Sequence, residues 1–285
     1  MIKIIAEIGI NYADQKGPDY FIDNIIKMVD IANVAGCDYV KFQKRNPDSC
    51  VPEDKKNNEK NVPWHDSSIT YLQYKKEVEL TKEQVSYVDY YCRDKKIGWF
   101  SSVWDIDSAY LISTFSNIVK IPSAHVTNIP LLELCKNLFS FRIMSTGMST
   151  EDEIKQAVDT LEPNVIMHTN SVYPTLIDDL YMQYIFWLKE KYPNCEIGYS
   201  SHYYGIKDVI TVVPLGVTWI EKHITLNHDN WGSDQKVSVE PNGLFELIKG
   251  VRDMERGWSK GYEARSLLPG EENKRSSLRI EKNKE

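Results

Sequence analysis

The feature that most constrains the fold is a regular alternation of short strand-like runs with longer helix-like runs along most of the chain. Eight runs have the length and β-branched character of strands, at residues 2–10, 39–43, 98–104, 118–124, 141–147, 165–170, 196–202 and 219–225. Helical patterns such as 21–36, 81–96, 150–161 and 181–192 lie between most of them. Since the sequence has no glycine-rich nucleotide loop, this order predicts an α/β protein with a (β/α)8 TIM barrel rather than a doubly wound sheet.

Two segments depart from this alternation. Residues 44–80 are too long and too polar for a simple connection between a strand and a helix, so we expect them to lie over the C-terminal face of the barrel, where active sites of such folds sit. The stretch 266–285 is charged and poorly periodic. We therefore expect a barrel domain over residues 1–265 and a surface or partly disordered tail over 266–285.

The overall charge, the apolar runs, the N-terminus and the cysteines argue against several classes of protein. A net charge of -7 argues against nucleic acid as a partner. We expect no membrane association, because no apolar run reaches the length of a transmembrane helix. The N-terminus shows no signal-peptide cleavage site, which predicts a cytoplasmic protein. The 5 cysteines are scattered without a CxxC pair, so reduced structural thiols are expected and a zinc ribbon is not.

Polar residues gather where the predicted strands end. In the run 219–225, Glu221 and His223 share one face of the strand, while Lys222 faces the helix layer. Polar side chains inside a barrel cost free energy unless they are paired or bound to a ligand. The other strands end similarly, with Glu7, Asn11, Lys41, Gln43, Lys120, Ser123, Ser145, His168, Tyr173, Ser200 and His202. This joint pattern predicts a ligand site at the C-terminal end of the barrel.

These residue types are suited to bind an anion next to a metal ion. Two lysines, Lys41 and Lys120, would hold a phosphate and a carboxylate as point charges. Hydrogen bonds to the same anion would come from Ser102, Ser123, Ser145 and Ser200. His202 and His223 would bind one divalent metal, with Asp234 as a third ligand or a base. Each residue alone also has a structural interpretation: Glu221 would only pair with Lys41 or Lys120, and a histidine would only bond within the core.

Several motifs together resemble the sialic acid synthase family, which includes N-acetylneuraminate, legionaminate and pseudaminate synthases. They are "IAEIGIN", "AGCDYVKFQ", "VKIPSAHVTNIPLLE", "STGMSTEDEI", "MHTNSVYP", "IGYSSH", "LGVTWIEKHITL" and "GSDQKVSVEP". They occur in order from about residue 4 to residue 258. The resemblance implies a (β/α)8 barrel that condenses phosphoenolpyruvate with the open-chain aldehyde of an amino sugar, giving a 2-keto-3-deoxy acid and phosphate.

The resemblance also implies roles for particular residues. His202 and His223 would hold a divalent metal, commonly Mn²⁺, with Mg²⁺ or Co²⁺ as alternatives. Phosphoenolpyruvate would be held by Lys41, Lys120, Ser102, Ser123, Ser145 and Ser200. Gln43 and Tyr173 would contact the sugar or a metal-bound water. Three catalytic carboxylates, Glu7, Glu221 and Asp234, would contact the same groups or transfer protons.

Some positions depart from the family's pattern. His125 stands where the family has a glutamate for sugar hydroxyls, so we expect it to bind the acceptor; Tyr12 and Ser201 replace a histidine and an acid. The family's C-terminal antifreeze-like domain, which supplies an arginine across a dimer, is expected to be absent, with Arg275 or Arg279 as substitutes. A homodimer is implied by the resemblance.

Three other functions stay open beside a synthase acting on an N-acyl hexosamine such as N-acetylmannosamine. One is an octulosonate-type synthase that joins phosphoenolpyruvate to another acceptor, such as a sugar phosphate. Another is a catalytically silent barrel that binds a sugar. A metal-dependent sugar isomerase would explain His202 and His223 but would leave Lys41 and Lys120 without a role.

Overall fold

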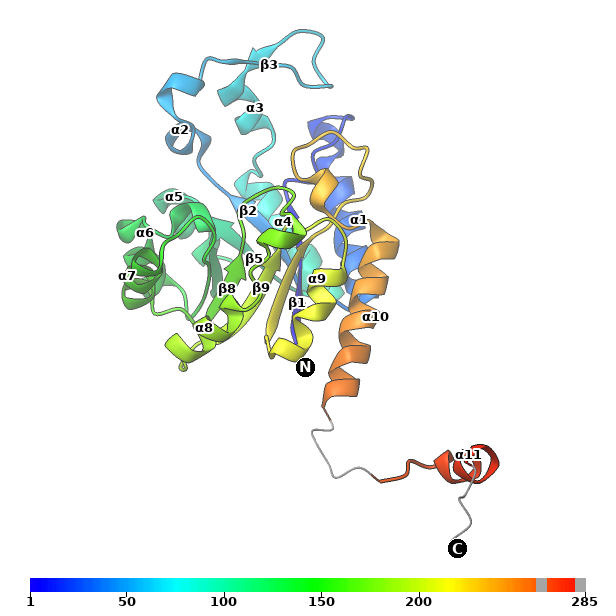
Figure 1. Cartoon of the computed structure of the whole chain (residues 1–285). Coiled ribbons are helices and arrows are strands. Elements are labelled where there is room, and N and C mark those ends of the chain that lie inside the picture. Colours follow the sequence, from blue (N-terminus) through cyan, green and yellow to red (C-terminus); the bar gives the residue numbers. More distant parts are fainter. Residues whose placement is uncertain (260–265, 280–285) are drawn as a thin grey trace, which may run out of the picture.

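Eight parallel strands form a closed barrel in the computed structural model, which describes residues 1–259 and 266–279 (Figure 1). Their order around the barrel is β1-β10-β9-β8-β7-β6-β5-β2. The strands are β1 (Lys3–Gly9), β2 (Tyr39–Lys44), β5 (Gly98–Val103), β6 (Ile118–Ile121), β7 (Phe141–Ser145), β8 (Val165–Thr169), β9 (Glu196–Ser201) and β10 (Trp219–His223). Each predicted strand overlaps one of them, and the predicted TIM barrel is confirmed.

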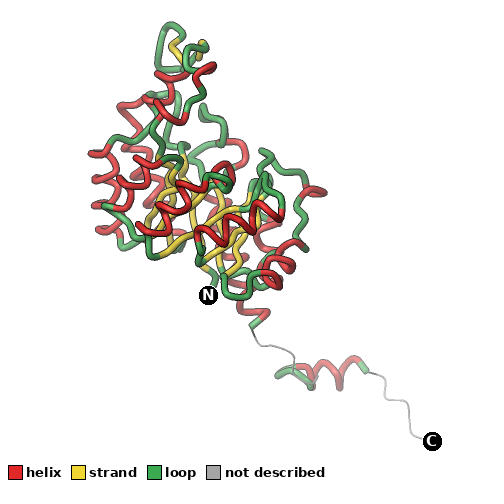
Figure 2. The backbone as a smooth tube through the Cα atoms, turned by 90° about the vertical axis from the view of Figure 1, so that its left-hand side faces the viewer, coloured by secondary structure: helices red, strands yellow, loops and turns green. Residues whose placement is uncertain are grey.

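Helices surround the barrel on its outer side (Figure 2). They are α1 (Phe21–Ala35), α4 (Lys82–Lys95), α5 (Ile106–Ser113), α6 (Ile129–Leu138), α7 (Glu151–Leu161), α8 (Tyr184–Lys191), α9 (Lys207–Thr211) and α10 (Pro241–Trp258). The sequence fixes several ends: α7 begins at a capping box of Thr150 with Glu153, and α4 begins at one of Thr81 with Gln84. Helix α1 ends at Gly36, whose φ of 96° suits glycine.

Short 3-10 helices complete the connections. They are η1 (Pro18–Tyr20), η2 (Glu53–Lys55), η3 (Ser123–His125), η4 (Ile177–Asp179), η5 (Val213–Leu215) and η6 (Gln235–Val237). Of these, η3 matters most for the site, because it begins directly after β6 and turns the chain away from the strand direction.

The interior of the barrel is divided into an apolar and a polar half. Buried side chains fill the half near the strands' N-terminal ends: Ile5, Phe100, Ile143, Val165, Met167 and Trp219. The ring of Trp219 lies 5.5 Å from those of both Tyr39 and Phe141, which closes this end. Because alternate residues point inward, Glu221 and His223 follow Trp219 on the same face, nearer the C-terminal end. The strand pattern therefore places the polar residues together at one end.

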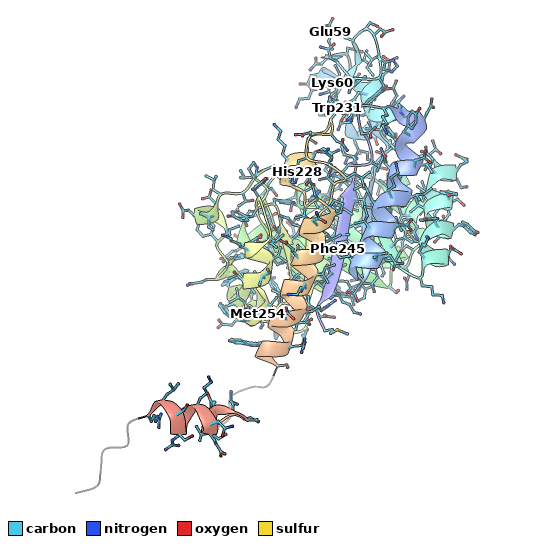
Figure 3. The ribbon with its side chains drawn as sticks, turned by 90° about the vertical axis from the view of Figure 1, so that its right-hand side faces the viewer. Glu59, Lys60, His228, Trp231, Phe245 and Met254 are labelled. Carbon is cyan, nitrogen blue, oxygen red and sulfur yellow. The ribbon has the colours of Figure 1, made fainter. Side chains whose placement is uncertain are left out.

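The long connection between β2 and α4 folds into a small subdomain of its own. It contains α2 (Pro47–Cys50), the hairpin of β3 (Glu59–Lys60) with β4 (Ile69–Thr70), and α3 (Tyr71–Glu77). Its Trp64 and Tyr74 rings lie 5.0 Å and 5.4 Å from Trp231, in the connection between β10 and α10. As expected, this subdomain stands above the C-terminal ends of the strands (Figure 1), and Figure 3 shows Lys60 beside Trp231.

The charged tail contains one helix, α11 (Glu271–Leu278), within the described residues 266–279. The rest of the predicted tail, 280–285, and the end of the predicted barrel domain, 260–265, lie outside the described residues. In the part of the chain that the structure describes, we find no helix with the length and apolar character to cross a membrane.

Candidate active site

A cavity of about 210 Å³ opens at the C-terminal end of the barrel. All the residues expected to have a role in the reaction except His125 and Asp234 line it: Glu7, Lys41, Gln43, Ser102, Lys120, Ser123, Ser145, Tyr173, Ser200, His202, Glu221 and His223. The strand-end residues Asn11 and His168 do not line it: Asn11 donates to the backbone oxygen of Ile224, and His168 lies 2.8 Å from that of Leu180. Its wall also contains Trp104, Pro122, Ala124, Met148 and Ser171, which the sequence had not singled out. A larger hollow of about 490 Å³ lies near Met1 and Trp258 at the other end, but neither histidine nor lysine lines it. The histidines and lysines suited to catalysis therefore line the smaller cavity.

Four buried charges form the floor of this cavity. The ammonium of Lys41 lies 2.7 Å from Glu7 and 3.7 Å from Glu221, and that of Lys120 lies 2.9 Å from Glu221. All four side chains are at most 5% exposed. Burying any one of these charges alone would cost several kcal/mol, about the range measured when a buried pair is broken. The alternation of signs makes the group tolerable and leaves it with no net charge.

The two carboxyl groups differ in acidity. Burial opposes ionisation of Glu221, but Lys120 and Lys41 outweigh it and lower its pKa to about 2. Burial raises the pKa of Glu7, and the attraction of Lys41 does not fully offset this. Among the cations, burial lowers the pKa of Lys120, whereas Glu221 and Glu7 overcome burial and raise the pKa of Lys41. Glu221 is thus a fixed anion, while Glu7 is the carboxyl group better suited to exchange a proton.

The two predicted metal-ligand histidines face each other with ring centres 5.4 Å apart. His202 places Nδ1 2.6 Å from the backbone oxygen of Asn170 and Nε2 2.9 Å from the hydroxyl of Tyr173. Because a carbonyl oxygen only accepts, Nδ1 carries the proton and Nε2 presents its lone pair to Tyr173. Burial lowers the pKa of His202 to about 3, so the ring is neutral at neutral pH.

The histidine pair has the chemistry of a partial metal site. Nδ1 of His223 is buried and has no hydrogen-bond partner within the described part of the chain. A backbone carbonyl that fixes the tautomer, as Asn170 does for His202, is the usual support of a metal-binding imidazole. Across residues 1–259 and 266–279, no three His, Cys, Asp or Glu side chains are grouped to hold an ion. Two protein ligands would leave the remaining positions to water and substrate.

Hydroxyl groups surround the charged floor. Ser200 donates to Glu221 at 3.0 Å, and Ser123 accepts from the backbone N–H of Gly147 at 3.1 Å. Gly147 follows β7 in a very tight turn: a Cβ atom there would lie 2.2 Å from Oγ of Ser171 and 2.9 Å from Oγ of Ser123. Only glycine therefore lets these two hydroxyls approach the end of β7. Ser102 and Ser145 complete the set from β5 and β7.

His125 and Asp234 lie outside the cavity wall. His125 is the last residue of η3, whose turn carries it away from β6 so that it packs edge-on to Trp104 with ring centres 5.1 Å apart. Asp234 accepts a hydrogen bond from Ser233 at 2.7 Å and reaches the site only through its charge, which contributes to the raised pKa of Tyr173. Both residues therefore belong to the surroundings of the cavity rather than to its floor.

Among the residues that the sequence did not indicate, Trp104 and Arg45 contact each other at the cavity. Trp104 is a wall residue, and the guanidinium of Arg45 lies 4.2 Å above its ring and donates to the side-chain oxygen of Gln43. The strand alternation contained the signal, because Trp104 and Arg45 lie two residues beyond Ser102 and Gln43.

Lys222 faces the helix layer, as the strand alternation predicted. It is buried and donates to Oγ of Ser201 at 2.9 Å and to the backbone oxygen of Tyr203. Ser201 in turn donates to Asp208 of α9, which also accepts from Tyr199 at 2.9 Å. This network ties β9 and β10 to the helix layer, on the side of the strands opposite the cavity.

Comparison with known proteins gives a consistent result. The model of the NeuB family matches residues 28–263. The N-acetylneuraminate-9-phosphate synthase of Drosophila melanogaster is 32% identical, over 88% of this chain and 67% of the relative. The N,N'-diacetyllegionaminic acid synthase of Campylobacter jejuni is 28% identical, over 92% of this chain and 79% of the relative. The sialic acid synthetase of Leptospira borgpetersenii, solved with citrate, superposes with a TM-score of 0.80 at 27% identity, over 97% of this chain and 92% of that one.

The matched region contains nearly the whole barrel and every residue of the cavity except Glu7. On this evidence, the chain belongs to the NeuB family.

Proposed function

We propose that this protein is a sialic-acid-type synthase. It condenses phosphoenolpyruvate with the aldehyde of an N-acyl hexosamine, such as N-acetylmannosamine, and releases a 2-keto-3-deoxy sugar acid and phosphate. The single observation that carries this proposal is the buried floor of Lys41, Lys120, Glu7 and Glu221 beside the two histidines His202 and His223 in one cavity. Membership in a family whose relatives are named as synthases of such acids supports the same reaction.

The charge of the cavity fits phosphoenolpyruvate only if a further cation is present. Phosphoenolpyruvate has a carboxylate and a phosphate, whereas Lys41 and Lys120 are already balanced by Glu7 and Glu221. An anion entering a buried site of no net charge needs additional positive charge. A divalent metal held by His202 and His223 would provide it, and we propose Mn²⁺, with Mg²⁺ or Co²⁺ as alternatives. When bound, such an ion acts as a Lewis acid that polarises the aldehyde carbonyl.

The chain's own residues bind the substrate and move protons. Lys41 and Lys120 hold the two anionic groups of phosphoenolpyruvate, with hydroxyls from the serines around the floor. The C3 carbon of phosphoenolpyruvate forms a bond to the aldehyde carbon, whose oxygen takes up a proton. Water then attacks C2, and the bond from C2 to the phosphate oxygen breaks. Glu7, the carboxyl group with the raised pKa, is placed to exchange these protons, while Glu221 keeps Lys120 oriented.

The other candidate functions receive less support. A catalytically silent sugar-binding barrel has no need for four buried charges and two histidines around one cavity. An octulosonate-type reaction with a sugar phosphate uses the same chemistry, so it differs only in the acceptor. The relatives differ in this respect too, since one is named for a 9-phosphate product and another for N,N'-diacetyllegionaminic acid.

We extend the proposal to the setting of the enzyme. A cytoplasmic location fits substrates that are metabolic intermediates. We also propose a homodimer, which sedimentation of the purified chain would test, and a division into a barrel over 1–265 and a tail over 266–285, which limited proteolysis would test.

The reaction itself is tested by incubating the purified protein with MnCl₂, phosphoenolpyruvate and a panel of sugars while inorganic phosphate is measured. The panel contains N-acetylmannosamine, its 6-phosphate, mannose, a 2,4-diacetamido hexose and arabinose 5-phosphate. Sugar-dependent phosphate release that disappears in Lys120→Met and His223→Ala supports a synthase. Failure to bind both phosphoenolpyruvate and Mn²⁺ contradicts it.

A further inference from the structure

The size of the cavity determines where an acceptor sugar extends. Its volume of about 210 Å³ is below the roughly 300–1,000 Å³ of pockets that enclose drug-sized ligands. If phosphoenolpyruvate occupies the charged floor, as the proposed function requires, most of the sugar must lie at the mouth. The subdomain formed by the connection between β2 and α4 stands above this end of the barrel, so the end of the sugar remote from its aldehyde would lie on the side that faces it (Figure 1).

Three cations, Arg45, Lys60 and Lys75, gather on this side, and we call them the mouth cluster. The ammonium groups of Lys60 and Lys75 lie 5.3 Å and 5.0 Å from the centre of one ring, that of Tyr74. Lys60 also lies 5.5 Å from the ring of Trp231, its neighbour in Figure 3. Arg45 lies close enough to contribute to the lowered pKa of Lys75.

The mouth cluster carries more positive than negative charge. No carboxylate among the described residues pairs directly with Lys75, and burial, followed by the repulsion of Arg45, lowers its pKa to about 8. The acids linked to the cluster are Glu79, which binds Lys44 at 2.9 Å and lies 3.7 Å from Arg45, Asp105, which accepts from the backbone N–H of Asn46 at 2.6 Å, and the more distant Asp234. Lys44, Arg45, Lys60 and Lys75 against Glu79, Asp105 and Asp234 leave one positive charge in surplus.

Arg45 connects the mouth cluster with the cavity. Arg45 lies on Trp104 and bonds Gln43, and both of these residues line the cavity. On the other side, the charge of Asp234 acts on both Lys75 and the wall residue Tyr173. The cluster therefore adjoins the cavity at Trp104 and Gln43. Nε of Arg45 is buried without a hydrogen-bond partner in the described chain and lies 3.7 Å from the carboxylate of Glu79.

We propose that Arg45, Lys60 and Lys75 form a subsite for a phosphate group on the acceptor sugar, at the end remote from the aldehyde. A phosphate monoester carries about −1.5 to −2 charge at pH 7, and the surplus positive charge of the cluster attracts it. The guanidinium supplies fixed donors, and the two ammonium groups adjust as point charges. The physiological acceptor is then a hexosamine phosphate. This inference rests on the proposed function for the position of the sugar, but the charge surplus does not depend on it.

The test compares three sugars in two assays. N-acetylmannosamine, its 6-phosphate and N-acetylmannosaminuronate are assayed for phosphate release with phosphoenolpyruvate and MnCl₂. Their binding is measured separately by calorimetry in EDTA, where no turnover interferes. Each assay uses the wild-type protein, Lys75→Met, and the control Lys76→Met, which changes a neighbouring lysine of α3 that pairs with the exposed Asp48 at 2.7 Å.

We expect the 6-phosphate to bind, and to react by kcat/KM, about 10- to 100-fold better than the neutral sugar, since a charged hydrogen bond contributes about that much. Lys75→Met should reduce this ratio about tenfold or more, and Lys76→Met should leave it unchanged. Equal binding of the phosphorylated and neutral sugars, or an equal advantage for the uronate, overturns the phosphate subsite. Phosphate-selective binding without any phosphate release supports the subsite and contradicts the proposed synthase instead.

Discussion

The carboxylate of Glu221 lies 2.9 Å from the ammonium of Lys120, and both groups are almost completely buried beneath the mouth of the barrel. They come from β10 and β6, which are far apart in the sequence and not adjacent in the barrel. Lys41 reaches the same carboxylate at 3.7 Å. The pair therefore joins opposite sides of the barrel by an ion pair near the C-terminal ends of the strands. Near their N-terminal ends, apolar packing joins the same sides.

Breaking this pair should destabilise the fold. Glu221→Gln leaves Lys120 buried without its closest partner, and removal of one partner of a buried pair costs about 3–5 kcal/mol. Urea unfolding of Glu221→Gln should show the loss. The double variant Lys120→Met with Glu221→Gln should recover part of the stability, because the unpaired ammonium is gone. Equal unfolding midpoints for wild type and Glu221→Gln would contradict this account.

Metal affinity should depend on both histidines. His202→Ala and His223→Ala each remove one imidazole ligand, so we expect Mn²⁺ affinity measured by calorimetry to fall at least about tenfold. His65→Ala is the matched control, because this exposed histidine bonds Glu77 in the subdomain. A comparable loss in His65→Ala would show that Mn²⁺ binds elsewhere.

The hydroxyl of Tyr173 should compete with the metal. It donates to Nε2 of His202 at 2.9 Å, and a hydrogen bond of this kind contributes about 1 kcal/mol. An ion that binds Nε2 must displace this bond. Tyr173→Phe should therefore raise Mn²⁺ affinity about fivefold in calorimetry, although turnover falls if the hydroxyl also contacts substrate. A weaker affinity in Tyr173→Phe would indicate instead that the tyrosine supports the ion.

Stability should depend on pH through Lys222. Burial, which outweighs the attraction of Asp208, lowers its pKa from 10.5 to about 8. Between these values the unfolded chain binds a proton that the folded chain does not, so the free energy of unfolding rises with pH. From pH 7 to pH 9, wild type should gain about 1 kcal/mol relative to Lys222→Met. A difference between the two proteins that stays constant with pH would contradict the depressed pKa.

The turn at Gly147 should be intolerant of any side chain. A Cβ would lie 2.2 Å from Ser171 and 2.9 Å from Ser123, so one of these hydroxyls must leave its position. If Ser123 helps to hold phosphoenolpyruvate, Gly147→Ala should raise the KM for phosphoenolpyruvate about tenfold, which is the loss of one good hydrogen bond. Circular dichroism should confirm an intact fold. Gly257→Ala, at a position with no neighbour within 4 Å, is the control.

Most of the fold and the floor of the site follow from local sequence patterns. Glu221 and His223 could be assigned to the barrel interior because strand alternation is a local rule, and parallel strands bring their C-terminal ends together. His125 could not be placed this way, since η3 interrupts the alternation just after β6. The contact of Arg45 with Trp104 was also beyond a local rule, because it depends on how two neighbouring strand ends lean toward each other.

The apolar half of the barrel has a consequence for the order of events during turnover. Trp219, Phe100 and their neighbours close the lower end, so ligands reach the charged floor only from above. A molecule that binds the floor must enter before anything that occupies the mouth, and it can leave only after the mouth is clear. If phosphoenolpyruvate occupies the floor, as proposed, it must bind before the sugar. Steady-state kinetics should show a compulsory-order pattern, with a dead-end complex whenever a sugar blocks an empty floor.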